Sequence, residues 1–179
     1  MSRNVEIKAE VQDYDEVVKK AIEISGKTPT ILKQHDIFFA SNNGPLKLRS
    51  VEENGNVRTE LIWCDRPDVA GPKLSDYSKC DVPHTVLNDL VNVLTLSMGK
   101  VGEVKKVRTL VIYGQTRIHI DRVEGLGDFM ELEVCLKPEE SVEHGETTAH
   151  SIRTELGISE SDLLTPAYVD MLNNLICVL

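Results

Sequence analysis

Five segments of the chain alternate apolar and polar or charged side chains residue by residue, and this pattern constrains the fold most strongly. Strict alternation is typical of a β-strand, because successive side chains point to opposite faces of a sheet. The polar positions are Asn4, Glu6, Lys8 and Glu10; Lys47 and Arg49; Lys106 and Arg108; Arg117, His119 and Asp121; and Glu131 and Glu133. The sequence therefore predicts a sheet with one apolar face and one face that carries both signs of charge.

Two architectures can present such a sheet. An open antiparallel sheet would turn the ionic face to water, but Lys and Glu are depleted in strands, and five solvated faces of this kind would be unusual. A sheet curled into a barrel would place its apolar face outside, under helices, and its ionic face around a lumen. About eight strands can close around one small ligand. Because the pattern recurs in five segments, we favour the closed barrel.

The remaining secondary structure fits this class of fold. Asn54-Gly55 is a strong signal for a tight turn between two paired strands. Helices are expected over residues 13–26, 83–99, 139–156 and 167–175, and strands over residues 5–11, 31–40, 46–51, 57–66, 75–82, 104–113, 116–123 and 129–136. We expect an α+β protein: an eight-stranded antiparallel β-barrel, forming a tunnel, with helices packed on the outside. Residues 1–179 would form this single domain.

Composition limits the partners and the compartment. The 179 residues carry 20 Lys and Arg against 29 Asp and Glu, a formal net charge of −9, which argues against a nucleic-acid partner. No apolar run approaches the ~18 residues that a membrane span needs, so no membrane partner is expected. The four cysteines form no CxxC pair, and the first residues lack the apolar core of a signal peptide. A cytoplasmic location is the expectation.

The ionic face itself suggests a ligand. Clustered Lys and Arg side chains would hold a polyanion such as a phosphate chain, with Arg binding in bidentate fashion. Carboxylates on the same face would repel that polyanion unless a divalent cation lay between them, and Mg²⁺ prefers carboxylate and phosphate oxygens. The cations are Lys47, Arg49, Lys106, Arg108 and Arg117, and the carboxylates are Glu6, Glu131 and Glu133. The pattern predicts a site for a metal-bound, small-molecule triphosphate.

These segments also resemble, in order and spacing, the motifs of the CYTH domain family. This family is also called the triphosphate tunnel metalloenzymes and includes class IV adenylyl cyclases and thiamine triphosphatases. The resemblance runs from Asn4 to Leu172, and its most specific part is Asp121–Glu133. The other matching stretches are Asn4–Lys8, Lys47–Arg49, Arg66–Lys73 and Lys106–Arg108. Asn4 departs from the family pattern, because it stands at the position of the first motif glutamate and brings no negative charge.

The resemblance implies a role for each matching residue and for Mg²⁺ or Mn²⁺ as cofactor. Cyclase-like relatives also suggest a homodimer. His119 shares the face, and it is open whether it has a structural or a catalytic role. The implied metal ligands are Glu6, Glu131 and Glu133, with Asp121 near a second ion; the implied phosphate ligands are Lys8, Lys47, Arg49, Arg66, Lys106, Arg108 and Arg117; and the implied catalytic residues are Lys8, Arg49, Arg108 and Asp121.

Three functions remain compatible with these residues. The first is metal-dependent hydrolysis of inorganic tripolyphosphate, a nucleoside triphosphate or thiamine triphosphate. The second is a class IV-type adenylyl cyclase that forms cyclic AMP from ATP in the same tunnel. The third is a non-catalytic binder of polyphosphate or organic phosphate, which Asn4 keeps open because it weakens the predicted metal site. We place the hydrolase first.

Overall fold

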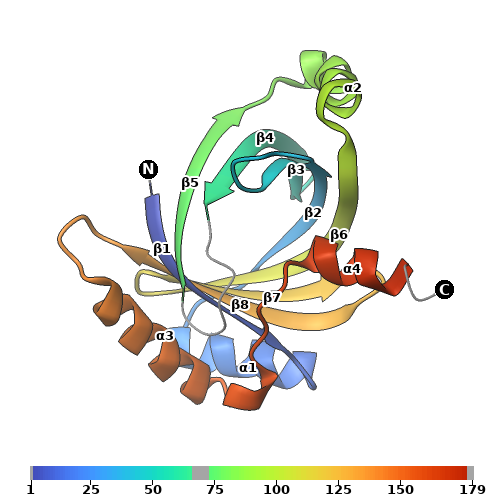
Figure 1. Cartoon of the computed structure of the whole chain (residues 1–179). Coiled ribbons are helices and arrows are strands. Elements are labelled where there is room, and N and C mark those ends of the chain that lie inside the picture. The colour runs from blue at the N-terminus through green and yellow to red at the C-terminus, as the bar shows by residue number, and fades with distance from the viewer. Residues whose placement is uncertain (1, 66–72, 177–179) are drawn as a thin grey trace.

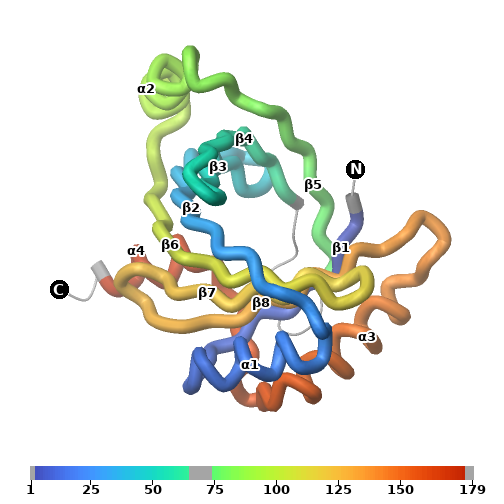
Figure 2. Tube along the Cα trace, turned by 180° about the vertical axis from the view of Figure 1, so that it is seen from behind, coloured from blue at the N-terminus to red at the C-terminus, as the bar shows by residue number. Residues whose placement is uncertain are grey.

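A computed structural model describes residues 2–65 and 73–176 of the chain. Within these residues, eight antiparallel strands close into a barrel in the order β1-β5-β4-β3-β2-β6-β7-β8 (Figures 1 and 2). This confirms the predicted fold class. The strands are β1 (Ser2–Glu10), β2 (Thr30–Phe39), β3 (Leu46–Glu53), β4 (Asn56–Asp65), β5 (Lys73–Asp81), β6 (Lys100–Tyr113), β7 (Thr116–Val123) and β8 (Gly127–Leu136).

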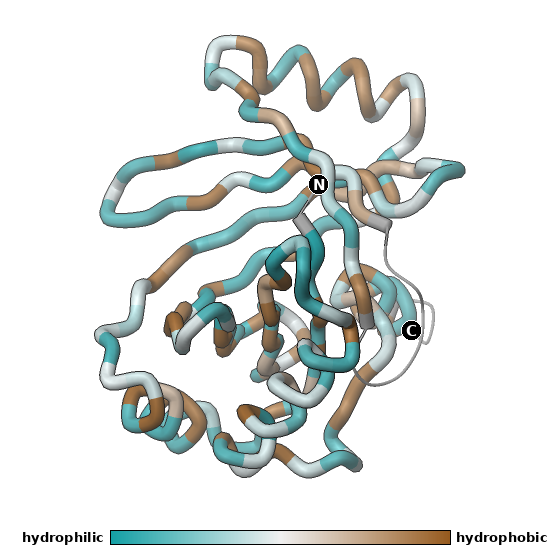
Figure 3. The backbone as a smooth tube through the Cα atoms, turned by 90° about the vertical axis from the view of Figure 1, so that its left-hand side faces the viewer, coloured by the Kyte–Doolittle hydropathy of each residue, from teal (hydrophilic) through white to brown (hydrophobic). Residues whose placement is uncertain are grey.

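The pairing register brings the ionic faces of neighbouring strands into phase. Glu6 and Lys8 of β1 lie opposite Glu133 and Glu131 of β8, and Arg108 of β6 lies opposite Asp121 of β7. The register of β2 and β6 shifts between Phe38 and Phe39, at the end of β2 and beyond Asp36. Because side chains alternate along every strand, the register elsewhere keeps the ionic residues on one face around the barrel. Figure 3 shows hydrophilic and hydrophobic positions alternating along several of the strands. The ionic face is therefore the lumenal face.

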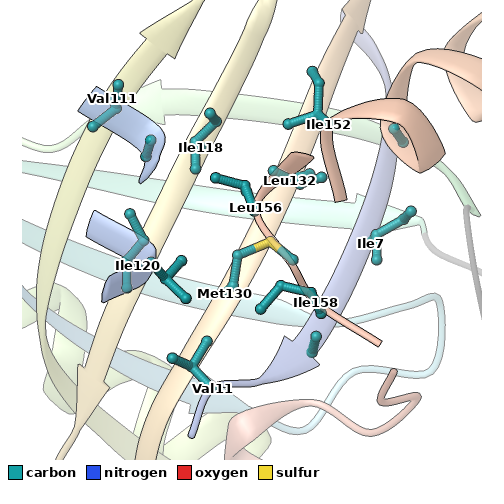
Figure 4. Packing of buried hydrophobic residues seen from close by; sticks show 14 of the residues in the cluster. Ile7, Val11, Val111, Ile118, Ile120, Met130, Leu132, Ile152, Leu156 and Ile158 are labelled. Atoms are coloured by element: carbon teal, nitrogen blue, oxygen red, sulfur yellow. The ribbon is translucent and has the colours of Figure 1, made fainter. Parts of the chain in front are cut away.

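Two helices cover the apolar outer face of β1, β6, β7 and β8. They are α1 (Tyr14–Ser25) and α3 (Val142–Glu155), which lie side by side below the barrel in Figure 1. Asp13 and Ser141 cap the N-termini of these helices, because the side chain of each accepts a hydrogen bond from a backbone N–H of the first turn. The residues labelled in this outer core are Ile7, Val11, Val111, Ile118, Ile120, Met130, Leu132, Ile152, Leu156 and Ile158 (Figure 4).

Gly145 sits in the middle of α3, where glycine is normally unfavourable. A β-carbon at this position would lie 2.6 Å from Val5 Cγ2 and 2.9 Å from Leu136 Cδ2. Glycine therefore allows α3 to approach β1 and β8 closely. The close packing of this helix on the sheet compensates for the lower helix propensity of glycine.

The other two helices pack at different places. A 3₁₀ turn (His84–Val86) precedes α2 (Leu87–Met98), which packs on the outer residues Phe39 and Leu48. A second 3₁₀ turn (Glu160–Asp162) precedes α4 (Tyr168–Ile176). Tyr168 and Val169 of α4 pack on Val104, Val123 and Phe129, which are in phase with the ionic residues of their strands. We conclude that α4 lies across one end of the lumen. In the described part of the chain, no helix is both long enough and apolar enough to span a membrane.

Candidate functional site

Asp121 of β7 is the centre of the most deeply buried ionic cluster in the lumen. Arg108 binds it in bidentate geometry, with Nε 2.7 Å from Oδ1 and Nη2 2.7 Å from Oδ2. Lys106 Nζ lies 2.8 Å from Oδ2, and the hydroxyl of Tyr168 donates to the same oxygen at 3.2 Å. These contacts hold both cations in fixed positions on the lumenal face of β6.

Glu131 of β8 extends this cluster toward β1. Its Oε2 lies 2.6 Å from Arg108 Nη2 and 3.9 Å from Lys106 Nζ, and its Oε1 lies 3.3 Å from Lys8 Nζ. Lys8 also donates to the carbonyl of Pro166 at 3.1 Å, and its ammonium lies 4.0 Å from the centre of the Tyr168 ring. The segment that leads into α4 therefore contacts the ionic cluster directly.

A second cluster forms on β2 and β3 around Asp36. Arg49 Nε and Nη2 donate to its two oxygens at 2.7 and 2.6 Å, and Lys47 Nζ lies 3.3 Å from Oδ2. Asp36 is not among the residues predicted from the sequence. Its neighbour His35 is also polar, so alternation fails there, and the pairing of Asp36 with Arg49 becomes visible only in the register of β2 and β3.

A third group joins Glu133 of β8 to its neighbours. Arg117 Nε donates to Glu133 Oε2 at 2.8 Å, and His119 Nδ1 lies 3.7 Å from Oε1. Glu6, directly opposite Glu133 across β1 and β8, accepts a hydrogen bond from the hydroxyl of Tyr77. With its amide oxygen turned toward β7, Asn4 accepts a hydrogen bond from Arg117 Nη2 at 3.1 Å.

Burial and neighbouring charges shift the pKa values of these groups in opposite ways. Burial alone would raise the pKa of Glu131, but Lys106, Lys8 and Arg108 outweigh it and hold the pKa well below its usual range. For Lys106, burial and the nearby Arg108 lower the pKa to about 8. Burial, with Arg108, also lowers the pKa of His119 to about 3, so its imidazole is neutral near pH 7.

The carboxylates offer a place for a divalent cation. Two like charges directly opposite each other on paired strands are destabilising, and Glu6 and Glu133 have this arrangement. A hard divalent ion between them would remove the repulsion, since carboxylate oxygens are its preferred ligands. Among the described residues, no three acidic, His or Cys side chains are already gathered around one metal position. A divalent cation would therefore bind mainly to the cross-strand pair of Glu6 and Glu133, and neighbouring groups would complete its coordination.

The lumen brings together almost all the residues that the sequence singled out. Arg66 is the exception, because it lies outside the described residues, as does most of the Arg66–Lys73 stretch. Both oxygens of Asp121 are bonded to cations in this structure, and Glu131 is shared between the lumenal cations around it. The predicted residues on the lumenal face are Glu6, Lys8, Lys47, Arg49, Lys106, Arg108, Arg117, Asp121, Glu131 and Glu133.

A closed antiparallel barrel with an ionic, mixed-sign lumen defines a class of tunnel proteins that can enclose a small polyanion. The family model of the CYTH domain matches residues 2–168 of the chain. The chain therefore belongs to the CYTH domain family. This confirms the resemblance inferred from the motifs.

Solved structures with the same fold share little sequence with this chain. The PH1012 protein from Pyrococcus horikoshii OT3 is 22% identical, with a TM-score of 0.74 and coverage of 93% of this chain and 98% of that one. The PH1819 protein from the same organism is 20% identical, with a TM-score of 0.76 and coverage of 96% and 98%. HpAC1 from Hippeastrum, described as having a dominant triphosphatase activity, is 13% identical, with a TM-score of 0.62 and coverage of 93% and 91%. No curated protein matches the chain in sequence.

Proposed function

We propose that the protein hydrolyses a small-molecule triphosphate in the lumen of the barrel, with Mg²⁺ or Mn²⁺ as cofactor. The observation that carries this proposal is the convergence of Lys and Arg side chains from β1, β3, β6 and β7 on one enclosed face, next to the opposed carboxylates of Glu6 and Glu133. Phosphoryl transfer requires mainly positioning and charge stabilisation, and these side chains supply both.

Each group of side chains has a part in this reaction. Arg49 and Arg108 each bind a carboxylate through Nε and Nη2, and their remaining N–H donors can bind phosphate oxygens. Asp36 and Asp121 act as positioning residues, since they hold these two guanidinium groups in place. A divalent ion at Glu6 and Glu133 would offset the charge of the bound phosphate oxygens. The side chains of Arg108 and Asp121 are almost fully buried, and burial strengthens their electrostatic contact.

Charge and composition bear on the partners and the location of the protein. The net charge of −9 opposes binding to a long nucleic acid, whereas the basic lumen suits a short triphosphate. We further propose that the protein acts in the cytoplasm without a nucleic-acid or membrane partner, as its composition suggests. A homodimer is proposed from the cyclase-like members of the family, and its mass in solution would test it.

The proposal is tested by the products of three substrates. We expect orthophosphate to be released from inorganic tripolyphosphate, ATP or thiamine triphosphate in the presence of Mg²⁺ or Mn²⁺, and no release when the metal is chelated. Cyclic AMP and pyrophosphate from ATP would instead identify a cyclase. Tight binding of every substrate without turnover would identify a non-catalytic binder and would contradict the proposal.

Triphosphate affinity should fall as the pH rises above about 8. The pKa of Lys106 is lowered to about 8, so the side chain loses its charge near that pH and its attraction for phosphate with it. The loss can reach about tenfold per pH unit above the pKa of the free protein, and it levels off above the pKa of the complex. Calorimetric titration with a non-hydrolysable ATP analogue between pH 7 and 10 measures this change.

Lys106→Arg is the matched variant for this measurement, because guanidinium stays charged over the whole range. It should flatten the pH dependence. An equally steep decline in Lys106→Arg and in the unmodified protein would show that another group titrates.

A further inference from the structure

Among the residues that the structure describes, a buried ring nitrogen of His119 has no hydrogen-bond partner. The side chain is only 5% exposed, and its Nδ1 atom has no hydrogen-bonding atom within reach in the described part of the chain. More than nine in ten buried polar groups in proteins are hydrogen-bonded, so such an atom requires an explanation. The alternation along β7 places His119 on the lumenal face, between Arg117 and Asp121.

The carboxylate nearest to His119 Nδ1 is that of Glu133, and its position suits a second ligand of the same metal ion. Glu133 Oε1 lies 3.7 Å from Nδ1, which is too long for a hydrogen bond, while Arg117 holds the other oxygen, Oε2. Nitrogen and oxygen ligands bind divalent metals at about 2.0–2.2 Å, so two of them on one ion lie about 3–3.6 Å apart. A small side-chain adjustment would bring Nδ1 and Oε1 into this range.

The chemistry of the neighbouring positions supports the same arrangement. Glu131 is already bonded to Lys8 and Arg108, which reduces its capacity to serve as a metal ligand. Asn4 on β1 carries no charge, and its amide oxygen can accept a hydrogen bond from Arg117. His119, beside Glu133, can add a neutral nitrogen donor to the oxygen donors of the carboxylates.

We propose that His119 Nδ1 is a ligand, together with the Glu133 carboxylate, of a divalent cation in the lumen. This inference rests on the proposed metal-dependent function and refines its metal site. Imidazole favours later transition metals, whose affinity for nitrogen ligands rises from Mn²⁺ to Co²⁺ and Ni²⁺, over Mg²⁺. The site should therefore prefer Co²⁺ to Mg²⁺ more strongly than a site made of oxygen ligands alone.

The test uses the whole protein with metal alone and no substrate. Mn²⁺ bound to the unmodified protein should show ¹⁴N coupling in pulsed electron paramagnetic resonance, because a nitrogen is directly bound to the ion. His119→Gln should remove this coupling, lower the affinity for Co²⁺ by at least about tenfold, and lower that for Mg²⁺ by less than about threefold. Calorimetric titration of each metal supplies the affinities.

His35→Gln is the matched control. His35 is 38% exposed on the outer face, where its Nε2 contacts Glu103 at 2.8 Å, so its replacement should leave the ¹⁴N coupling unchanged. The melting temperature of each variant checks the fold, and the spectrum of the unmodified protein does not depend on any variant being stable.

Several results would overturn the inference while leaving the proposed function intact. Stoichiometric Mn²⁺ binding without ¹⁴N coupling would show that only oxygen ligands are used. Equal losses of Co²⁺ and Mg²⁺ affinity in His119→Gln would show that His119 only supports the site. Absence of metal binding would also overturn the inference, and the separate measurement of orthophosphate release with Mg²⁺ shows whether the proposed hydrolysis fails as well.

Discussion

Triphosphate turnover should fall at least about a hundredfold when Glu131 is replaced by Gln, while the fold is retained. Glu131 orients Lys8 and Arg108 in the lumen through contacts of 3.3 and 2.6 Å. Removing one group that positions charge against the substrate typically costs a factor of about 10²–10³ in rate. Gln keeps the shape of the side chain but has one acceptor oxygen, so it keeps only one of these two contacts and turns its amide N–H groups toward the other cation. Ala would leave both cations without this partner.

The measurement is the initial rate of orthophosphate release with Mg²⁺ at saturating substrate, alongside the free energy of unfolding. Glu52→Gln is the matched control. Glu52 lies on the outer face and contacts the exposed Lys33 at 3.1 Å, so its loss should leave both quantities nearly unchanged. A Glu131→Gln variant that is folded and fully active would show that the reaction does not take place at this cluster.

The alternation of side chains favoured a barrel over an open sheet and grouped most of its lumenal residues. The period of two along a strand directly determines which side chains share a face, so Glu6 and Lys8, or Glu131 and Glu133, could be grouped without any knowledge of pairing. The ionic face was assigned to a lumen, and not to a face in contact with solvent, because the same alternation recurs in segments far apart in the sequence. Neither part of this prediction requires knowledge of which strands pair.

The contacts between strands could not be predicted in the same way. Asp36 lies in a segment in which polar residues occupy both faces, and its role appears only when β2 is paired with β3. Tyr168 belongs to a helix far along the chain, and its hydroxyl reaches Asp121 because α4 lies across the end of the lumen. Both features depend on tertiary placement, which has no local signature.

The same limit applies to the metal site. The sequence grouped Glu131 with Glu6 and Glu133 as carboxylates, since their charge and spacing are alike. In the structure Glu131 is surrounded by Lys8, Lys106 and Arg108, while Glu133 binds Arg117 and lies opposite Glu6. The neighbours of each carboxylate depend on the register of β1, β7 and β8, and not on the motif itself.

Asp36→Asn should lower the free energy of unfolding by about 3 kcal/mol at pH 7. The buried carboxylate is the shared partner of Arg49 and Lys47, and removing one side of a buried ion pair leaves the other charge uncompensated. Arg49 and Lys47 are about one-fifth exposed, so some water can reach them, which places the expected cost at the lower end of the range for such pairs.

The difference in the free energy of unfolding between Asp36→Asn and the unmodified protein should become smaller at acidic pH. Burial alone would raise the pKa of Asp36, but Arg49 and Lys47 lower it well below the unfolded value of 3.8. A carboxyl group whose pKa is lower in the folded state stabilises the fold above the unfolded pKa, and this contribution is lost as the pH falls toward the folded pKa. Urea denaturation at pH 7, 5, 4 and 3 should show that this difference, the gap between the two free energies of unfolding, is constant down to about pH 4 and narrows below it.

This variant separates the role of Asp36 from a general effect of acid. Other carboxylates of the lumen lose their contributions in both proteins, so those losses cancel in the difference, and Glu52→Gln should show no gap at any pH. A gap that stays constant to pH 3 would mean that Asp36 is not the group that titrates. If the gap narrows as expected, Asp36 holds Arg49 in the lumen through its charge, which is the state in which that guanidinium can present its remaining donors to a phosphate chain.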